Sequence, residues 1–283
     1  MHDRPPIAVI AGNGILPVEI AYGLTAQGRK VFIFSIQGEA DADFSQFDNE
    51  SIEWGQIGRL FKLLKTRKVK QVILAGGIIG RPEFSIKKMD WGAMRTLPGL
   101  LATMLEGDNA ILSGVISIFE KRGFEVCNIA ELLPELVVES GAITTTKPKA
   151  AAQDRIKEGA GVTKALGEFD VGQGCVVVGR RAVALEGVEG TDAMLRRVTE
   201  LRLIGRLPKK RGGVLIKSAK PNQDERADLP TIGPDTIESV HAASLLGIGV
   251  QAGKTLIVER EKTIKRANEL KLFIFGYDGD DLG

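Results

Sequence analysis

The chain has 283 residues, of which 43% are hydrophobic and 26% charged, proportions typical of globular proteins that bury a core. This length accommodates one large domain or two of ordinary size, and we expect two. The net charge of +2, from 38 basic and 36 acidic side chains, gives no electrostatic case for a nucleic-acid partner.

Histidine and cysteine are scarce, which narrows the chemistry further. His2 and His241 are the two histidines, too few for a multi-histidine metal site, and we expect His241 to be structural. Cys127 and Cys175 have no paired spacing, so neither a disulfide framework nor a thiolate zinc site is expected. The first residues lack a signal-peptide pattern, and no apolar run approaches about 18 residues. We therefore expect a cytoplasmic protein.

The first third of the chain alternates predicted strands and helices. An apolar run at Ile7 to Ala11 and an amphipathic stretch at Leu16 to Gln27 precede a strand at Val31 to Ile36. A helix at Ile57 to Thr66 and a buried strand at Val69 to Ala75 follow. This alternation predicts a parallel sheet covered on both faces.

The pattern changes after a predicted helix at Asp108 to Lys121 and a short strand at Phe124 to Cys127, so we place a domain boundary near residue 135. The second half is α/β of a less regular type. Its predicted elements are a helix at Ala150 to Lys157, a β-hairpin at Gly174 to Gly179 and Ala182 to Gly187, a helix at Thr191 to Leu203, a strand at Gly213 to Ser218, a helix at Asp235 to Leu246, a strand at Thr255 to Val258, a helix at Glu261 to Lys271 and a strand at Leu272 to Phe275.

A glycine turn follows the first predicted strand. Gly12, Asn13 and Gly14 lie between strand and helix, where backbone amides and the helix N-terminus can hold a phosphate. Pro17 replaces the third glycine of a dinucleotide motif, and proline in a first helical turn has its own structural reason. Nucleotide binding and a plain tight turn both remain open.

An acidic loop, Glu186 to Asp192, lies between a predicted strand and helix. Thr191 or Asp192 could cap that helix by accepting a backbone hydrogen bond. The carboxylates could instead hold a hard cation. Both interpretations can hold at different residues.

The segment from Lys217 to Gly233 is the most informative. A strand leads into a loop of lysine, carboxylates, arginine and glutamine, with prolines at both ends. Magnesium prefers oxygen ligands, so one or two carboxylates plus substrate phosphates would hold it, and the ion would neutralise pyrophosphate oxygens and help activate water. A charged surface loop with local salt bridges is the alternative.

The densest basic cluster of the chain is Lys209 to Arg211. We interpret it first as a solvated loop, which could still meet phosphate.

Segments of the chain resemble a known family. They are IAVIAGNGILPVEIA, VILAGGIIGRP, ALEGVEGTDAMLRRV and KPNQDERADLPTIGPDTIE. Their order and spacing, from about Ile7 to Phe275, resemble the UDP-2,3-diacylglucosamine pyrophosphatases of the LpxI family of lipid A biosynthesis.

The resemblance implies an α/β fold with a Rossmann-like, nucleotide-sugar-binding parallel-sheet domain at residues 1–135. A C-terminal α/β domain of a family-specific fold, residues 136–283, would carry the catalytic carboxylate loop. The implied reaction is hydrolysis of UDP-2,3-diacylglucosamine to UMP and 2,3-diacylglucosamine 1-phosphate (lipid X), with Mg²⁺ as the metal and Mn²⁺ as a substitute. Peripheral contact with the inner membrane fits a substrate with acyl chains, and a homodimer stays open.

The family's essential aspartate matches Asp224, which we expect to bind or orient the magnesium ion and the attacking water. Asp192 and Asp228 are further candidate metal ligands. Lys217 and Arg226 are candidate phosphate partners. The expected substrate-binding residues are Gly12, Asn13, Gly14, Gly76, Gly77, Gly190, Thr191, Lys217, Gln223 and Arg226.

Rival functions come from other classes. An NAD-dependent oxidoreductase would use the first glycine turn, but an acid at the end of the second strand is missing, since Glu39 and Asp41 lie in the following loop. A non-catalytic nucleotide-sugar or lipid-binding protein is the other rival. Release of UMP separates hydrolysis from both.

Overall fold

The computed structural model describes residues 4–78, 90, 108–221 and 223–279. The chain divides into two compact units, the first formed by Met1–Pro134 with Asp224–Asp228 and the second by Glu135–Gln223 with Leu229–Gly283. The segment Asp224–Asp228, expected in the second domain, thus packs with the first unit. A short 3-10 helix, η2 (Pro134–Leu136), lies where the chain passes between the units.

The sheet of the first unit has the strand order β3-β2-β1-β4-β5 and is parallel throughout. Its strands are β1 (Ile7–Ala11), β2 (Val31–Ile36), β3 (Asp48–Ile52), β4 (Gln71–Ala75) and β5 (Glu125–Val126). The chain builds outward from β1 in one direction and then crosses to β4 on the other side. The carboxyl ends of β1 and β4 therefore meet at the switch point, where ligands bind in open α/β sheets.

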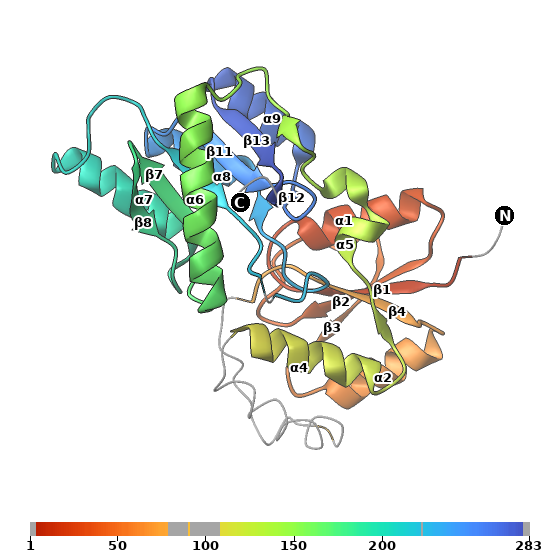
Figure 1. Ribbon diagram of the computed structural model, residues 1–283. Coiled ribbons are helices and arrows are strands. Elements are labelled where there is room, and N and C mark those ends of the chain that lie inside the picture. The colour runs from red at the N-terminus through yellow and green to blue at the C-terminus, as the bar shows by residue number, and fades with distance from the viewer. Residues whose placement is uncertain (1–3, 79–89, 91–107, 222, 280–283) are drawn as a thin grey trace. The chain divides into compact units, whose positions relative to one another are not determined.

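Helices cover both faces of this sheet, as Figure 1 shows, with α1 and α5 on one side and α2 and α4 on the other. They are α1 (Leu16–Ala26), α2 (Ile57–Thr66), α4 (Asp108–Glu120) and α5 (Ile129–Leu132). Side chains alternate along each strand, so Phe32 and Phe34 pack toward α2 and α4 with Leu64, Ile116 and Phe119. Burial on both faces explains why β1, β2 and β4 are nearly continuous apolar runs.

The second unit has a mixed sheet in the order β6-β13-β11-β9-β7-β8. Its central strands β9, β11 and β13 are parallel, whereas β7, β8 and β6 run antiparallel to their neighbours. Its strands are β6 (Gly141–Ala142), β7 (Gly174–Val178), β8 (Arg181–Leu185), β9 (Val214–Lys217), β11 (Gly247–Gln251) and β13 (Phe273–Tyr277). A separate parallel pair joins β10 (Thr231–Ile232) and β12 (Leu256–Ile257).

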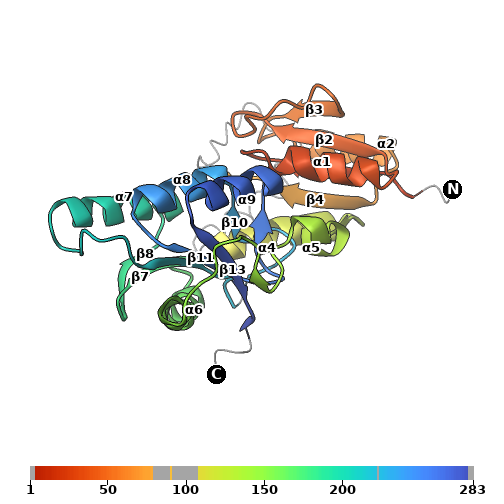
Figure 2. The same cartoon turned by 90° about the horizontal axis from the view of Figure 1, so that it is seen from above.

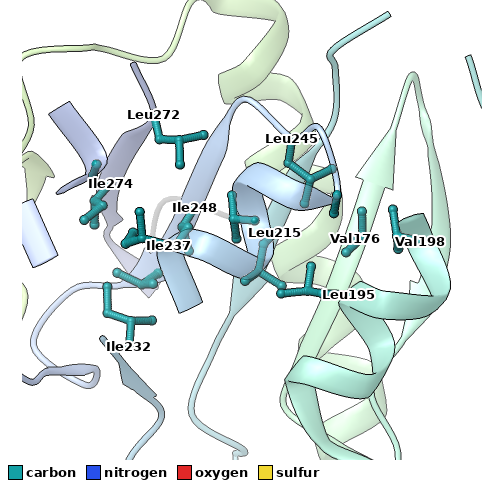
Figure 3. Close-up of a cluster of buried hydrophobic side chains, with 14 of the residues drawn as sticks. Val176, Leu195, Val198, Leu215, Ile232, Ile237, Leu245, Ile248, Leu272 and Ile274 are labelled. Carbon is teal, nitrogen blue, oxygen red and sulfur yellow. The ribbon is translucent and has the colours of Figure 1, made fainter. Parts of the chain in front are cut away.

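This sheet is also covered on both faces. Figure 2 shows α6 on one side and α7, α8 and α9 on the other. The helices are α6 (Ala150–Glu168), α7 (Gly190–Leu203), α8 (Pro234–Ala242) and α9 (Arg260–Glu269). The larger core lies under α7, α8 and α9, where Leu195 and Val198 of α7 meet Val176, Leu215 and Ile248 of the sheet (Figure 3).

The α/β class and the N-terminal parallel sheet are confirmed, but several elements differ from the predictions. Strands β3, β6, β10 and β11 were not predicted, because β3 is polar and mostly exposed, β6 and β10 are very short, and β11 is interrupted by glycine. The predicted helix ending at Leu246 stops at Ala242, because Ser244 adopts a left-handed φ of 52°.

Helix α6 runs to Glu168 instead of the predicted Lys157. The helix continues through Gly159, which is a packing position, since a Cβ there would lie 2.5 Å from the side chain of Ile216. None of the described helices is both long and apolar enough to cross a membrane.

Candidate active site

Two glycine turns are hydrogen-bonded to each other at the switch point of the first unit. The Asn13 amide donates to the Gly77 carbonyl at 2.7 Å, and the Gly77 amide donates to the Asn13 carbonyl at 3.0 Å. A Cβ on Gly12 would lie 2.3 Å from the Gly77 carbonyl oxygen, and Gly76 has a φ of 90°. Gly12 and Gly76 are therefore required by close backbone approach, and the structure brings the predicted turn after β1 together with Gly76 and Gly77.

The amides of the first turn have partners within the protein. The Gly12 amide donates to the Ala75 carbonyl at 2.8 Å, and the Gly14 amide donates to Asp41 Oδ1 at 2.8 Å. Since the Asn13 amide donates to Gly77, the amides of residues 12–14 all donate within the protein. A phosphate bound at Gly14 would also be repelled by the Asp41 carboxylate. This geometry disfavours a dinucleotide phosphate cradle. Asp41, which follows the second strand, accepts from the Gly14 amide and so holds the turn.

The acidic loop after β8 is organised around the buried carboxylate of Glu186. Thr191 Oγ1 donates to Glu186 Oε1 at 2.8 Å. Glu186 Oε2 is buried and has no hydrogen-bond partner among the described residues. It would lie 2.2 Å from a Cβ on Gly174, so glycine at that position makes room for the carboxylate.

The predicted helix caps are not formed at this loop. The residue preceding α7 is Glu189, which makes no side-chain cap bond, and Gly190 has a left-handed φ of 78°. The Thr191 hydroxyl donates to Glu186 instead of capping the helix. Asp192 is exposed and accepts a long hydrogen bond from Ser239 Oγ on α8 at 3.4 Å.

Lys217 lies at the carboxyl end of β9, and it is buried with an exposed fraction of 6%. Its Nζ donates to the Thr231 carbonyl at 3.1 Å and so closes the base of the charged loop. Lys217 pairs with Gly174 across β9 and β7, and paired residues of antiparallel strands point to one face. The lysine therefore lies on the sheet face that also carries the Glu186 carboxylate.

The residue after Lys217 is fixed by buried hydroxyl groups. Ser218 Oγ lies 2.6 Å from Thr163 Oγ1 of α6 and also bonds the Tyr277 hydroxyl. Burial raises the pKa of Tyr277 to about 12, so the phenol stays protonated. Since Thr163 can donate to the Ala160 carbonyl at 3.1 Å, the bonds can run in one direction from Tyr277 through Ser218 to α6. These bonds hold the end of β9 in place.

The first part of the charged loop is fastened to the second unit. Lys220 Nζ pairs with Asp170 Oδ1 at 2.6 Å, with side-chain exposures of 10% and 27%. The Lys220 amide donates to Gln223 Oε1 at 2.9 Å, and Gln223 is itself buried. Gly167 of α6 has no room for a Cβ, which would lie 2.7 Å from Pro221.

Asp224 is held by Arg226 within the same short turn. Asp224 Oδ1 accepts from the Arg226 amide at 3.1 Å and from its Nε at 2.9 Å, and Oδ2 accepts from Nη2 at 2.7 Å. Arg226 Nη1 also donates to Glu120 Oε1 of α4 at 2.6 Å. Ala227 packs against the apolar cluster of α2 and α4, so both polar and apolar contacts attach Asp224–Asp228 to the first unit.

These contacts determine the charge state of Asp224. The side-chain hydrogen bonds from Arg226 lower the pKa of the Asp224 carboxyl group, with a smaller opposing contribution from burial. The same bonds raise the pKa of Arg226. A carboxylate has about four acceptor sites, and the bonds from Arg226 use three of them. Asp224 is therefore an oriented anion that can accept a further water or serve as a single-oxygen metal ligand.

The predicted metal ligands do not form an all-protein cage in the part of the chain that the structure describes, where no group of three or more carboxylate, histidine or cysteine side chains is placed to hold a metal. Asp224 and Asp228 belong to the first unit and Asp192 to the second. A Mg²⁺ ion that also binds substrate phosphates needs only one or two protein carboxylates. The remaining acceptor site of Asp224 fits the role of one such ligand.

The two thiols lie in the core, whereas the described histidine lies at the surface. Cys127 and Cys175 are free and buried, and burial raises their pKa values to about 11 and about 12. His241 is exposed on α8, and His2 lies outside the described residues. Sequence reasoning missed the part played by Glu120, because its contact with Arg226 spans 106 positions and leaves no local signal.

The fold and the charged loop together define a two-unit α/β protein whose first unit has the Rossmann strand order. Residues 6–136 match the LpxI N-terminal domain, and residues 139–275 match the LpxI C-terminal domain. The chain therefore belongs to the LpxI family, as the sequence segments suggested. A curated relative, the UDP-2,3-diacylglucosamine pyrophosphatase LpxI of Caulobacter vibrioides, is 37% identical over 273 residues, which cover 96% of this chain and 97% of the relative.

Proposed function

We propose that this chain hydrolyses the pyrophosphate of UDP-2,3-diacylglucosamine, releasing UMP and 2,3-diacylglucosamine 1-phosphate in lipid A biosynthesis. The observation that carries the proposal is 37% identity over 97% of a relative that bears this activity in its name. Both units of the chain match the family, so the similarity includes the glycine turns as well as the charged loop.

Asp224 is our proposed catalytic residue. Its lowered pKa keeps the carboxylate ionised at neutral pH, and Arg226 fixes both of its oxygens. An anion oriented in this way can orient a water molecule for in-line attack on phosphorus. We assign Arg226 chiefly a positioning role, because its Nε, Nη1 and Nη2 already donate to Asp224 and Glu120.

Lys217 is our proposed phosphate partner. Its ammonium group lies at the carboxyl end of a central strand and is buried, so its attraction for a phosphoryl oxygen is less screened than at the surface. Phosphoryl transfer depends mainly on positioning and on stabilising charge on the oxygens. Thr191, held by Glu186, supplies a hydroxyl on the same unit. We include Gly190 and Gln223 among the substrate contacts.

A magnesium ion is part of the proposal. When bound, it would neutralise charge on the pyrophosphate oxygens, and Asp224 is the residue that we propose as its ligand, with Asp192 and Asp228 as further candidates. Manganese would substitute, since it accepts oxygen ligands. The switch-point turns are our proposed contact for the nucleotide-sugar part, through groups other than the amides of residues 12–14.

The test is UMP release from UDP-2,3-diacylglucosamine by the full chain, with Mg²⁺, with Mn²⁺ and after exhaustive chelation. We expect release with either metal, loss on chelation and recovery when Mg²⁺ is restored. Undiminished release after chelation would reject the metal, whereas no release from folded protein under any condition would reject the hydrolase. A change in nicotinamide absorbance on addition of NAD and substrate would favour the oxidoreductase instead.

A further inference from the structure

A basic and apolar surface forms where α7 ends. The stretch from residue 196 to residue 211 contains Arg196, Arg197, Arg202, Arg206, Lys209, Lys210 and Arg211 and a single acid, Glu200. The whole chain has 38 basic and 36 acidic side chains, so outside this stretch acids outnumber bases. The positive charge of the protein is therefore concentrated here, on α7 and on the loop that leaves its end (Figure 1) and leads to β9.

Two aliphatic side chains accompany this charge. Leu203 and Ile204 are 79% and 70% exposed, whereas Leu207 in the same loop is buried in the core under α7. Arg196, Arg197, Arg206, Lys209 and Lys210 of the same stretch are also exposed. We call this set, with Leu203 and Ile204, the basic-apolar patch.

The loop that displays the patch is attached to the rest of the second unit by hydrogen bonds. Arg202 is buried and donates to the carbonyl groups of Ala243 at 2.7 Å and Lys210 at 3.2 Å, and it also bonds those of Pro208 and Gly212. Arg211 fastens the end of the loop through the Leu245 carbonyl at 2.9 Å. Arg202 and Arg211 thus donate to backbone carbonyl groups, whereas the other basic side chains of the stretch are exposed. Leu203 and Ile204 are thus exposed beside a loop whose backbone is hydrogen-bonded to its surroundings.

We propose that the basic-apolar patch docks the second unit on the surface of an anionic lipid bilayer. Lysine and arginine near such a surface are attracted to acidic headgroups, and aliphatic side chains beside them gain by entering the boundary between headgroups and acyl chains. Single-stranded nucleic acid is bound through basic grooves combined with aromatic stacking platforms, and residues 196–211 contain no aromatic side chain. The bilayer therefore fits both components of the patch.

Co-sedimentation with vesicles tests the proposal without any substrate, so its outcome is independent of the proposed hydrolysis. The full chain is mixed with vesicles of phosphatidylcholine alone or of phosphatidylcholine with phosphatidylglycerol. We expect binding to the second kind only, weakened by salt. At roughly fivefold per cation, the Lys209→Ala/Lys210→Ala variant should bind roughly 30-fold more weakly.

Two further variants separate charge from apolar contact. Leu203→Ser/Ile204→Ser keeps every cation and should still weaken vesicle binding by roughly 10-fold, because two aliphatic groups no longer leave water. Arg180→Ala/Arg181→Ala removes an exposed basic pair from the β7–β8 turn and should bind nearly as the wild type does. Unchanged melting temperatures would show that all three variants fold.

Several results would overturn the proposal. These are equal binding to both kinds of vesicle, no binding by the wild type, the same loss in the control pair as in the lysine pair, and no loss when Leu203 and Ile204 are replaced. Preference for a polyuridylate oligonucleotide over vesicles, abolished by the lysine substitutions, would assign the patch to nucleic acid instead.

Discussion

Replacement of Asp224 separates a catalytic carboxylate from a structural one, because this side chain does two things at once. Its Oδ1 accepts from the Arg226 amide, which stabilises the turn, and its two oxygens bind the Arg226 side chain. Alanine removes both contributions. Asparagine keeps an oxygen that can accept from the Arg226 amide, but it carries no charge.

The expected loss of stability is modest. Hydrogen bonds to charged groups contribute about 1.5 to 3 kcal/mol when buried, but Asp224 and Arg226 are 22% and 35% exposed, and exposed ion pairs contribute at most about 1 kcal/mol. We expect Asp224→Ala to lower the free energy of unfolding by about 1 to 2 kcal/mol and Asp224→Asn by less. The apolar contact of Ala227 with the first unit remains, so both variants should fold.

The expected loss of activity is larger. If the charge acts on the metal or the attacking water, both variants should release UMP at least about 100-fold more slowly, equivalent to about 2.7 kcal/mol of barrier, with little change in substrate affinity. Glu225→Gln, which neutralises the adjacent carboxylate, is the matched control and should stay near wild type. Melting temperature, substrate binding and UMP release are measured on all three. Recovery of turnover in Asp224→Asn in parallel with its stability would show a structural role and refute our assignment.

The remaining predictions concern the positions where the backbone or a buried charge leaves little freedom. Gly12→Ala places a Cβ 2.3 Å from the Gly77 carbonyl oxygen and should destabilise the first unit by about 1 to 3 kcal/mol in urea unfolding. In Gly14→Ala the new Cβ meets open space, but the residue must keep a φ of 90°. This variant should therefore lose about 1 to 2 kcal/mol of stability. Equal, negligible effects would contradict the observed close approach. Glu186→Ala leaves the Thr191 hydroxyl without its acceptor, so it should lower the free energy of unfolding by about 1 to 3 kcal/mol and also raise KM. Glu186→Gln keeps an acceptor and should restore KM. A KM that stays raised in Glu186→Gln would show that the charge of Glu186 is required.

Local sequence patterns determined much of each unit. Apolar runs at β1, β2 and β4 and helical spacing at α2 and α4 are consequences of burial on both faces of a sheet, and burial imposes its periodicity on the residues themselves. The helix α2 begins and ends where it was predicted, at Ile57 and Thr66. The resemblance to the LpxI family was also contained in the order of short segments, and the match of both domains confirms it.

The tertiary structure alone decided the long-range contacts, because their partners are distant in the chain and leave no period to detect. The bond from Gly14 to Asp41, the pairing of Arg226 with Glu120 and the attachment of Asp224–Asp228 to the first unit are of this kind. The strand order also had to come from the tertiary structure, since β1 lies between β2 and β4 only because the chain crosses the sheet before β4. Sequence could nominate Asp224 and its local partner Arg226, but only the fold brings Glu120 to Arg226 and attaches this turn to the first unit.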